Sequence, residues 1–179
     1  MASIFGHAVA AIAIGSSFSK PFKSIKFWLI CIGCSILPDL DVIGFSFGIS
    51  YTSFWGHRGF SHSITFAILI SIFFSMTFYY SLIKKEYKKL ILIGSCFFLC
   101  TLSHSLLDAL TTGGKGVALF SPFDNTRYFF PWKVIKVSPI GISKFFSQRG
   151  INVIVSELKW IGIPSLIFMI GVKLLKKKN

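Results

Sequence analysis

Residues 38–62 read PDLDVIGFSFGISYTSFWGHRGFSH, and the rest of the chain is organised around this stretch. It begins with two carboxylates, Asp39 and Asp41, and ends with two of the chain's four histidines, His57 and His62. The residues between them are mostly apolar. In a chain of this character, each buried ionisable side chain needs a partner or a metal ion. The stretch therefore predicts a polar centre inside an apolar protein.

The composition indicates an integral membrane protein. Of the 179 residues, 53% are hydrophobic and 14% are charged, and the mean hydropathy is +0.71. A soluble domain typically has about 25% charged residues. The length predicts a single domain over residues 1–179. The net charge of +13 does not indicate a nucleic-acid partner, because much of the lysine lies in short runs beside apolar segments, as at the cytoplasmic rim of a membrane protein.

The apolar segments predict an all-α bundle of four to five membrane helices. We expect these helices at residues 2–19, 27–37, 63–83, 90–110 and 160–175. The second is expected to break at Pro38 unless residues 42–47 continue it, and irregular backbone at membrane depth must be buried in protein or line a wet cavity. The third has no formal charge and is long enough to cross about 30 Å of hydrocarbon. Residues 111–159, which contain several turn signals, are expected to form a long connection.

The lysine runs predict which face of the membrane holds the polar residues. The basic segments at residues 20–26, 84–89 and 173–178 share one side if the helices alternate, and the positive-inside rule makes that side cytoplasmic. All four histidines and three of the four aspartates then lie at or near the opposite face. Residues 111–159 also carry basic side chains on that face, but a segment of this length is less decisive than the short turns.

A metal centre is the function that this gathering of residues predicts. His104 and Asp108 lie one helical turn apart, so they can bind one ion together, or the carboxylate can orient the imidazole as a metal ligand. The alternative is that the two residues form a pair that only packs the helices. His7, alone in an apolar segment, would by itself be a core histidine. A His/Asp set without thiolates suits Zn²⁺, with Mn²⁺ or Fe²⁺ as alternatives, in an open hydrolytic site. More than four candidate ligands leave room for two ions.

The residues around the central stretch add three expectations. Asp39 and Asp41 would point the same way in an alternating geometry, whereas a simple turn after Pro38 is the alternative. Arg58 would repel a cation unless an anion is bound as well, which indicates a phosphate or carboxylate ligand. Ser61 is expected to cap the helix that begins near His62.

Four cysteines lie in apolar stretches: Cys31, Cys34, Cys96 and Cys100. The C-I-G-C pair has no second C-x-x-C to complete a zinc knuckle. We expect these cysteines to be small packing residues of membrane helices.

These motifs resemble those of a known family. A Gly-His at residues 6–7, P-D-L-D at 38–41, H-R-G-F-S-H-S at 57–63 and H-x-x-x-D at 104–108, followed by T-x-G and S-P-F, resemble the YdjM-type proteins. The match covers roughly residues 7–123. The resemblance implies a LexA-regulated, inner-membrane, metal-dependent hydrolase, distantly similar to zinc-dependent phospholipase C and P1-type nucleases.

The resemblance also implies roles for eight residues. The metal ligands would be His7, Asp39, His57, His104 and Asp108, and the groups serving as ligand, phosphate contact or acid–base catalyst would be Asp41, Arg58 and His62. The phospholipases carry a further H-x-x-x-E that this chain lacks, since no histidine follows His104. One or two metal ions are therefore expected rather than three.

We expect a metal-activated water to attack a phosphoester of a lipid or lipid-linked substrate that enters from the bilayer, at the non-cytoplasmic face of the inner membrane. Arg58 would hold the substrate anion, and Asp41 or His62 would move the proton. The alternatives are a non-enzymatic metal-binding or transport protein and a structural membrane protein whose polar groups pair with one another. A transporter needs ionisable residues midway along its helices, and residues 63–83 have none.

Overall fold

A computed structural model describes residues 1–18 and 24–178 of the chain. Its helices, in chain order, are α1 (Ile4–Phe18), α2 (Ile25–Ile36), η1 (Leu37–Phe47), η2 (Phe60–His62), α3 (Ile64–Tyr79), α4 (Leu82–Lys85), α5 (Tyr87–Ala109), α6 (Ile142–Phe145), α7 (Gln148–Glu157), η3 (Leu158–Gly162) and α8 (Ile163–Lys178). η1 and η2 are 3₁₀ helices and η3 is a short π-helix. Within the described residues there is no strand, which confirms the all-α class.

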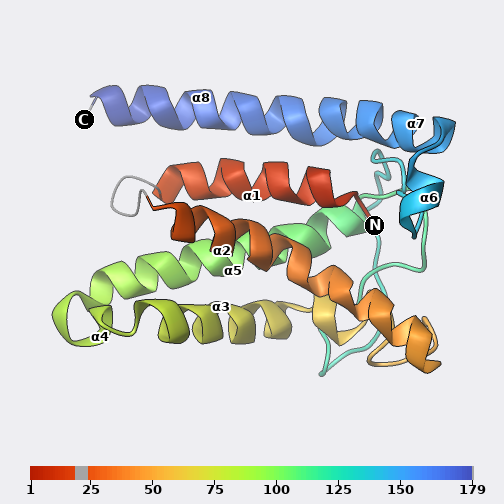
Figure 1. The fold of residues 1–179 in the computed structure, drawn as a ribbon, viewed down its shortest axis with the longest axis horizontal. Helices are drawn as coiled ribbons and strands as arrows, with labels where there is room; N and C mark the ends of the chain where they lie inside the picture. Colours follow the sequence, from red (N-terminus) through yellow and green to blue (C-terminus); the bar gives the residue numbers. More distant parts are fainter. Residues whose placement is uncertain (19–23, 179) are drawn as a thin grey trace.

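The long helices lie side by side along one axis (Figure 1). α5 packs against α1, α2 and α3, and α8 packs along α1. Small and aromatic side chains fill the space between α1, α2 and α5: Ala11, Phe27, Ile30, Cys31, Cys34, Ile93, Cys96, Phe97 and Cys100. Because lipid is as apolar as these side chains, close packing rather than the hydrophobic effect holds membrane helices together.

In the part of the chain that the structure describes, five apolar helical segments form the bundle, in agreement with the expected four to five. Three helical segments are long and apolar enough to cross a membrane, namely Ile25–Phe47, Tyr87–Ala109 and Gln148–Lys177. α1 and α3 are shorter apolar helices of 15 and 16 residues. α3 therefore ends four residues before the expected boundary at residue 83, and α4 follows it.

The second helix changes type at the P-D-L-D motif instead of breaking there. α2 passes into the 3₁₀ helix η1, which continues for 11 residues and ends at Gly48 with φ +75°. Pro38 lies in the first turn of η1, and because proline lacks the N–H that would continue the α-helical hydrogen bonds of α2, the helix changes type there. A 3₁₀ helix of this length is uncommon and often marks a functional segment.

The last span begins earlier than expected. α7, η3 and α8 form one continuous helical segment, so residues 148–159 belong to a helix and not to the connection. The polar residues Gln148, Arg149 and Asn152 interrupt the apolar run and hide the start of this helix in the sequence.

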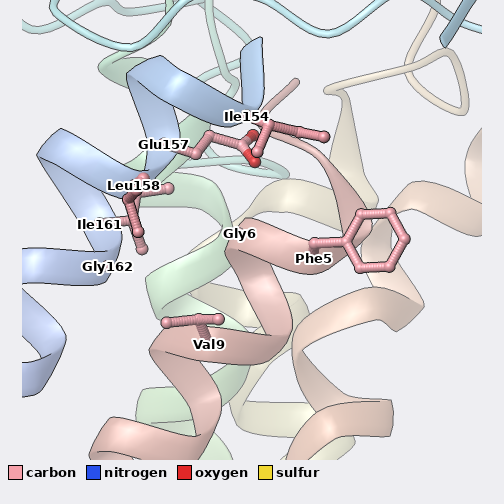
Figure 2. A pocket seen from close by; sticks show the side chains of 8 residues that line it. All are labelled: Phe5, Gly6, Val9, Ile154, Glu157, Leu158, Ile161 and Gly162. Atoms are coloured by element: carbon pink, nitrogen blue, oxygen red, sulfur yellow. The ribbon is translucent and has the colours of Figure 1, made fainter. Parts of the chain in front are cut away.

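α1 and α7 approach closely beside a groove of about 280 Å³ (Figure 2). A Cβ atom at Gly6 would lie 3.0 Å from the Glu157 carboxyl carbon, so the missing side chain permits this approach. The Glu157 carboxylate accepts hydrogen bonds from the backbone N–H and the hydroxyl of Ser3. This buried link ties the start of the chain to the last span.

The two ends of the bundle differ in what they carry. α4 and the end of α8 lie at one end, and the start of α1, the end of η1 and the loop of residues 48–59 lie at the other (Figure 1). The lysine runs of residues 84–89 and 173–178 are therefore at the same end, as alternating helices require. The third expected basic segment, residues 20–26, lies partly outside the described residues.

Candidate metal centre

Four ionisable side chains from three elements meet at the end of the bundle opposite the lysine runs. Asp39 comes from η1, His62 from η2, and His104 and Asp108 from α5. Each offers a ligand atom within 4.8 Å of the others. His62, His104 and Asp108 are fully buried, and Asp39 is 6% exposed. We refer to these four residues as the His/Asp centre.

The separations within the His/Asp centre suit a small divalent ion. His62 Nε2 lies 3.0 Å from His104 Nε2. Asp39 Oδ1 lies 3.4 Å from His104 Nε2 and 3.6 Å from His62 Nε2, and Asp108 Oδ2 lies 3.7 Å from His62 Nε2. Four tetrahedral ligands bound to Zn²⁺ at about 2.0–2.1 Å are separated by about 3.3 Å. The observed distances bracket that value.

The outer nitrogen of each histidine in the centre has a partner that orients its ring. His104 Nδ1 lies 2.7 Å from the carbonyl oxygen of Ser35, which accepts only, so Nδ1 donates and Nε2 keeps its lone pair. His62 Nδ1 lies 3.2 Å from Asp41 Oδ2 and 3.0 Å from Ser61 Oγ. Metal-binding histidines have this type of support, with the second nitrogen held by a carbonyl or carboxylate.

Asp41 and His57 form a second group with His62. His57 Nδ1 lies 2.6 Å from Asp41 Oδ1, and all three residues offer ligand atoms within 4.8 Å of one another. The other oxygen of Asp41 accepts hydrogen bonds from the Ser61 hydroxyl at 2.6 Å and from the Arg58 backbone N–H at 3.1 Å. Asp41 is thus well supplied with donors, whereas Asp39 belongs to the His/Asp centre. The two carboxylates do not point the same way, because residues two apart in a 3₁₀ helix are separated by about 240° around the helix axis.

His7 and Arg58 lie at the edge of the His/Asp centre, where both approach the carboxylate of Asp108. The ring of His7 stacks on that of His104 with 3.8 Å between centroids, and His7 Nε2 lies 3.5 Å from Asp108 Oδ1. Arg58 is fully buried, and its Nε lies 3.1 Å from Asp108 Oδ2. Its other two nitrogens donate to the Gly113 carbonyl and the Thr111 hydroxyl, both at 2.9 Å.

Unpaired buried atoms show that the residues fit a metal ion. Among the described residues, both oxygens of Asp39, Oδ2 of Asp108 and both ring nitrogens of His7 are buried without a hydrogen-bond partner. Buried polar atoms are almost always paired. A divalent ion would provide a partner for carboxylate oxygens of Asp39 and Asp108 and for one ring nitrogen of His7, and the donor set is the one that Zn²⁺, Mn²⁺ and Fe²⁺ accept.

His57 and His62 differ in the direction in which their surroundings shift the pKa. Burial lowers the pKa of His62, but the carboxylates of Asp108, Asp39 and Asp41 outweigh burial and raise this pKa to about 10. Burial also lowers the pKa of His57, and the hydrogen bond with Asp41 opposes this only in part. The surroundings of His62 therefore stabilise positive charge, as expected beside a cation site.

Close backbone contacts shape the loop that carries His57 and Arg58. A Cβ atom at Gly59 would lie 2.3 Å from the Phe54 carbonyl oxygen, and one at Gly56 would lie 2.2 Å from that of Ser50. Arg58 between them has φ +65°. Only glycine permits this folding at residues 56 and 59. The cap of the next helix is Ser63, whose side chain accepts from Phe66 N–H at 3.0 Å, and not Ser61 as expected from the sequence.

The residues that the structure brings together were all candidates from the sequence, but several residues that contact them were not. Ser35, Ser61 and Thr111 hold His104, Asp41 and Arg58 in place. Ser61 and Thr111 lie within the motifs H-R-G-F-S-H-S and T-x-G, but the motifs did not indicate these contacts, and nothing in the local pattern distinguishes Ser35 from other polar residues. Glu157 had a signal, because it is an acidic residue among the apolar residues 153–158.

A groove of about 480 Å³ runs beside the second group of residues. Asp41 and Ser61 lie on its wall, and most of the remaining lining is apolar, including Trp55, Phe60 and Phe66. The groove therefore combines an apolar surface with two polar groups that contact His62.

Comparison with known proteins agrees with the membrane assignment. The family model described as YdjM inner membrane protein matches residues 1–179. Inner membrane protein YbcI of Escherichia coli (strain K12) is 37% identical over 171 residues, which cover 94% of this chain and 95% of YbcI. No solved structure matches the chain. From the whole-length match and this identity, the chain belongs to the YdjM inner membrane protein family and is a protein of the inner membrane.

Proposed function

We propose that the protein is a metal-dependent hydrolase that cleaves a phosphoester of a lipid or lipid-linked substrate. One observation carries the proposal: His62 and His104 direct Nε2 toward a common centre with two carboxylates, while their Nδ1 atoms are held from outside. This arrangement directs Nε2 of both residues at the centre, where a bound metal would displace the proton that the raised pKa keeps on His62. A divalent ion bound there would lower the pKa of a bound water and polarise a phosphoryl oxygen.

The residues of the His/Asp centre would hold the first ion. His7 is proposed as a further ligand, because both of its ring nitrogens are buried without a hydrogen bond. His57 and Asp41 would hold a second ion when two are bound. Zn²⁺ is the proposed metal, since imidazole with carboxylate is the donor set of catalytic zinc sites.

The remaining roles follow from position. Asp41 is the proposed proton acceptor, because it borders the apolar groove and already accepts hydrogen bonds from Ser61. Arg58 is proposed to stabilise the substrate anion. Its buried positive charge lies beside Asp108, which is one of the proposed metal ligands, so the charge is close to the proposed metal site. The groove favours a substrate with an apolar part that arrives sideways from the bilayer. We propose that the site faces the non-cytoplasmic side, opposite the lysine-rich end.

A non-enzymatic metal-binding or transport protein is the second candidate. The complete burial of His62, His104 and Asp108 favours it, because a fully enclosed ion holds its ligands without offering a position to substrate. The two functions predict the same metal content but differ in hydrolysis.

The test uses the purified full-length protein in detergent. We expect bound divalent metal by elemental analysis, and hydrolysis of a chromogenic phosphodiester or of phospholipid vesicles. His104→Ala and Asp39→Asn should remove the metal and reduce hydrolysis at least 100-fold, whereas Ser103→Ala, beside His104 on the same helix, should retain both. Metal without hydrolysis of either substrate would favour the second candidate. Hydrolysis that survives chelation and both substitutions would refute the metal-dependent mechanism.

A further inference from the structure

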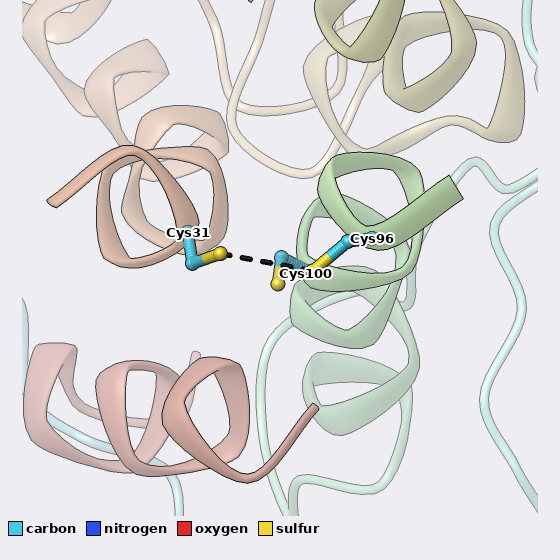
Figure 3. Close-up of side chains that lie close together, drawn as sticks. All are labelled: Cys31, Cys96 and Cys100. Atoms are coloured by element: carbon cyan, nitrogen blue, oxygen red, sulfur yellow. Dashed lines mark hydrogen bonds between the residues drawn. The ribbon is translucent and has the colours of Figure 1, made fainter. Parts of the chain in front are cut away.

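Three thiols meet in the interior of the bundle, away from the His/Asp centre (Figure 3). Cys31 lies on α2, and Cys96 and Cys100 lie on α5. Each offers a sulfur within 4.8 Å of the other two, and all three are fully buried. We refer to these residues as the thiol group. Cys34 is also fully buried but lies outside it.

The helix geometry explains why these thiols are close together. Cys96 and Cys100 are four residues apart, so they share one face of α5. α2 packs against that face in the core and directs Cys31 toward it, with Cys31 Sγ 3.7 Å from Cys96 Sγ. Two packed helices therefore hold all three sulfurs, without a loop that would have to become ordered on binding.

The sulfur separations match those around one bound ion. An ion about 2.3 Å from each of three sulfurs in a plane would hold them about 4.0 Å apart. The 3.7 Å contact and the 4.8 Å upper limit bracket this spacing. Packing of small apolar residues accounts for the burial of the cysteines, but it does not require three sulfurs to converge.

The chemistry of the group selects the ion. Soft thiolates favour Cu(I), whereas Zn²⁺ in a closed site takes four ligands and this group offers three. A ligating thiol gives up its proton, and an apolar interior favours the lowest net charge. A monovalent ion held by one thiolate, with the other two sulfurs remaining neutral thiols, releases one proton and leaves the site without net charge, whereas three thiolates would leave two negative charges.

We propose that Cys31, Cys96 and Cys100 form a second metal site that binds one Cu(I) ion. The site is independent of the proposed hydrolase function. Its position has a structural consequence, because Cys100 lies one helical turn before His104 and α2 leads directly into Asp39. A bound ion would cross-link α5, which carries His104 and Asp108, to α2, which continues into η1 with Asp39.

The test titrates the full-length protein with Cu(I) under anaerobic, reducing conditions against a colorimetric Cu(I) chelator. We expect the wild type to withhold one equivalent from the chelator and to show thiolate-to-copper absorption in the ultraviolet. Cys96→Ser and Cys31→Ser should lose both signals. Cys34→Ser is the matched control, and it should keep both because Cys34 is equally buried but outside the thiol group.

Two further measurements keep the result interpretable. Cys96→Ala avoids placing a hydroxyl in the apolar core, and thermal unfolding in detergent should show that this variant is folded while it fails to bind Cu(I). His104→Ala should still bind Cu(I), which separates the two metal sites. Equal loss of copper to the chelator from wild type and Cys96→Ala would overturn the proposal. So would loss of binding in Cys34→Ser, or a Cys31–Cys96 disulfide in place of copper binding.

Discussion

At the scale of single residues, the partner of one ring nitrogen decides what the other nitrogen can do. The Ser35 carbonyl holds Nδ1 of His104, and Asp41 with Ser61 holds Nδ1 of His62, so in both residues Nε2 faces the His/Asp centre. Nδ1 of His57 is likewise hydrogen-bonded, to the Asp41 carboxylate, but His57 is not one of the four residues of the His/Asp centre. The structure therefore distinguishes two histidines that the H-R-G-F-S-H motif presents alike.

This difference predicts unequal effects of two alanine substitutions. His62→Ala removes a ligand of the first ion, and we expect divalent metal to be lost during gel filtration. His57→Ala removes a support of Asp41, so at least one ion per chain should remain, with an affinity about 10-fold lower, as when a residue that hydrogen-bonds to a metal ligand is lost. Elemental analysis and metal titration measure both. Retention of all metal in His62→Ala, with loss in His57→Ala, would reverse the assignment.

Arg58 provides a second prediction at this scale. Arg58→Lys keeps the charge, but an ammonium cannot reproduce the three contacts with Asp108, Gly113 and Thr111. Because the site is fully buried, we expect the free energy of unfolding to fall by about 2 kcal/mol or more. Denaturant unfolding in micelles measures this. Arg149→Lys is the exposed control, with an expected change below about 0.5 kcal/mol; equal effects of the two substitutions would show that the buried contacts contribute little.

At the scale of secondary structure elements, the sequence predicted the positions of polar motifs better than their conformation. P-D-L-D was expected to break the second helix; instead it lies where α2 passes into η1. The continuation as a 3₁₀ helix was not predictable, because the residue pattern of η1 fits a turn, an α-helix or a 3₁₀ helix equally well. The directions of Asp39 and Asp41 depend on that choice. For this reason the sequence could identify the candidate residues but could not divide them between two groups.

The loop before η2 offers a prediction about an element. Gly59→Ala would force a Cβ atom against the Phe54 carbonyl, so we expect a lower melting temperature and loss of the metal that His62 helps to hold. Gly33→Ala is the matched control, because a Cβ atom there meets nothing within 4 Å and alanine favours the helix. Thermal unfolding and elemental analysis of both variants provide the comparison. An unchanged metal content in Gly59→Ala would indicate that the loop tolerates rearrangement.

At the scale of the whole molecule, alternation of apolar segments was enough to predict that distant residues meet. His7, Asp39, His62 and His104 lie far apart in the sequence but close together in space. They meet because each long helix reverses the direction of the chain (Figure 1). The error concerned residues 148–159, where polar side chains on one face of a long helix resemble a connection. That error concealed Glu157 and its link to Ser3.

The orientation of the bundle in the membrane is the last prediction, and it follows from the separation of the lysine-rich end from the His/Asp centre. We expect a cysteine at Thr52 or Thr126, both exposed in loops at the end with the His/Asp centre, to react with a membrane-impermeant maleimide in cells with a permeabilised outer membrane. A cysteine at Ser81, exposed beside α4, should react only after the inner membrane is opened. The four native cysteines are buried, so the unmodified protein is the background control. Labelling of Ser81→Cys from outside, with protection of the other two, would place the site on the cytoplasmic side. The basic residues of the connection at residues 111–147 would then outweigh the short lysine runs in setting the topology.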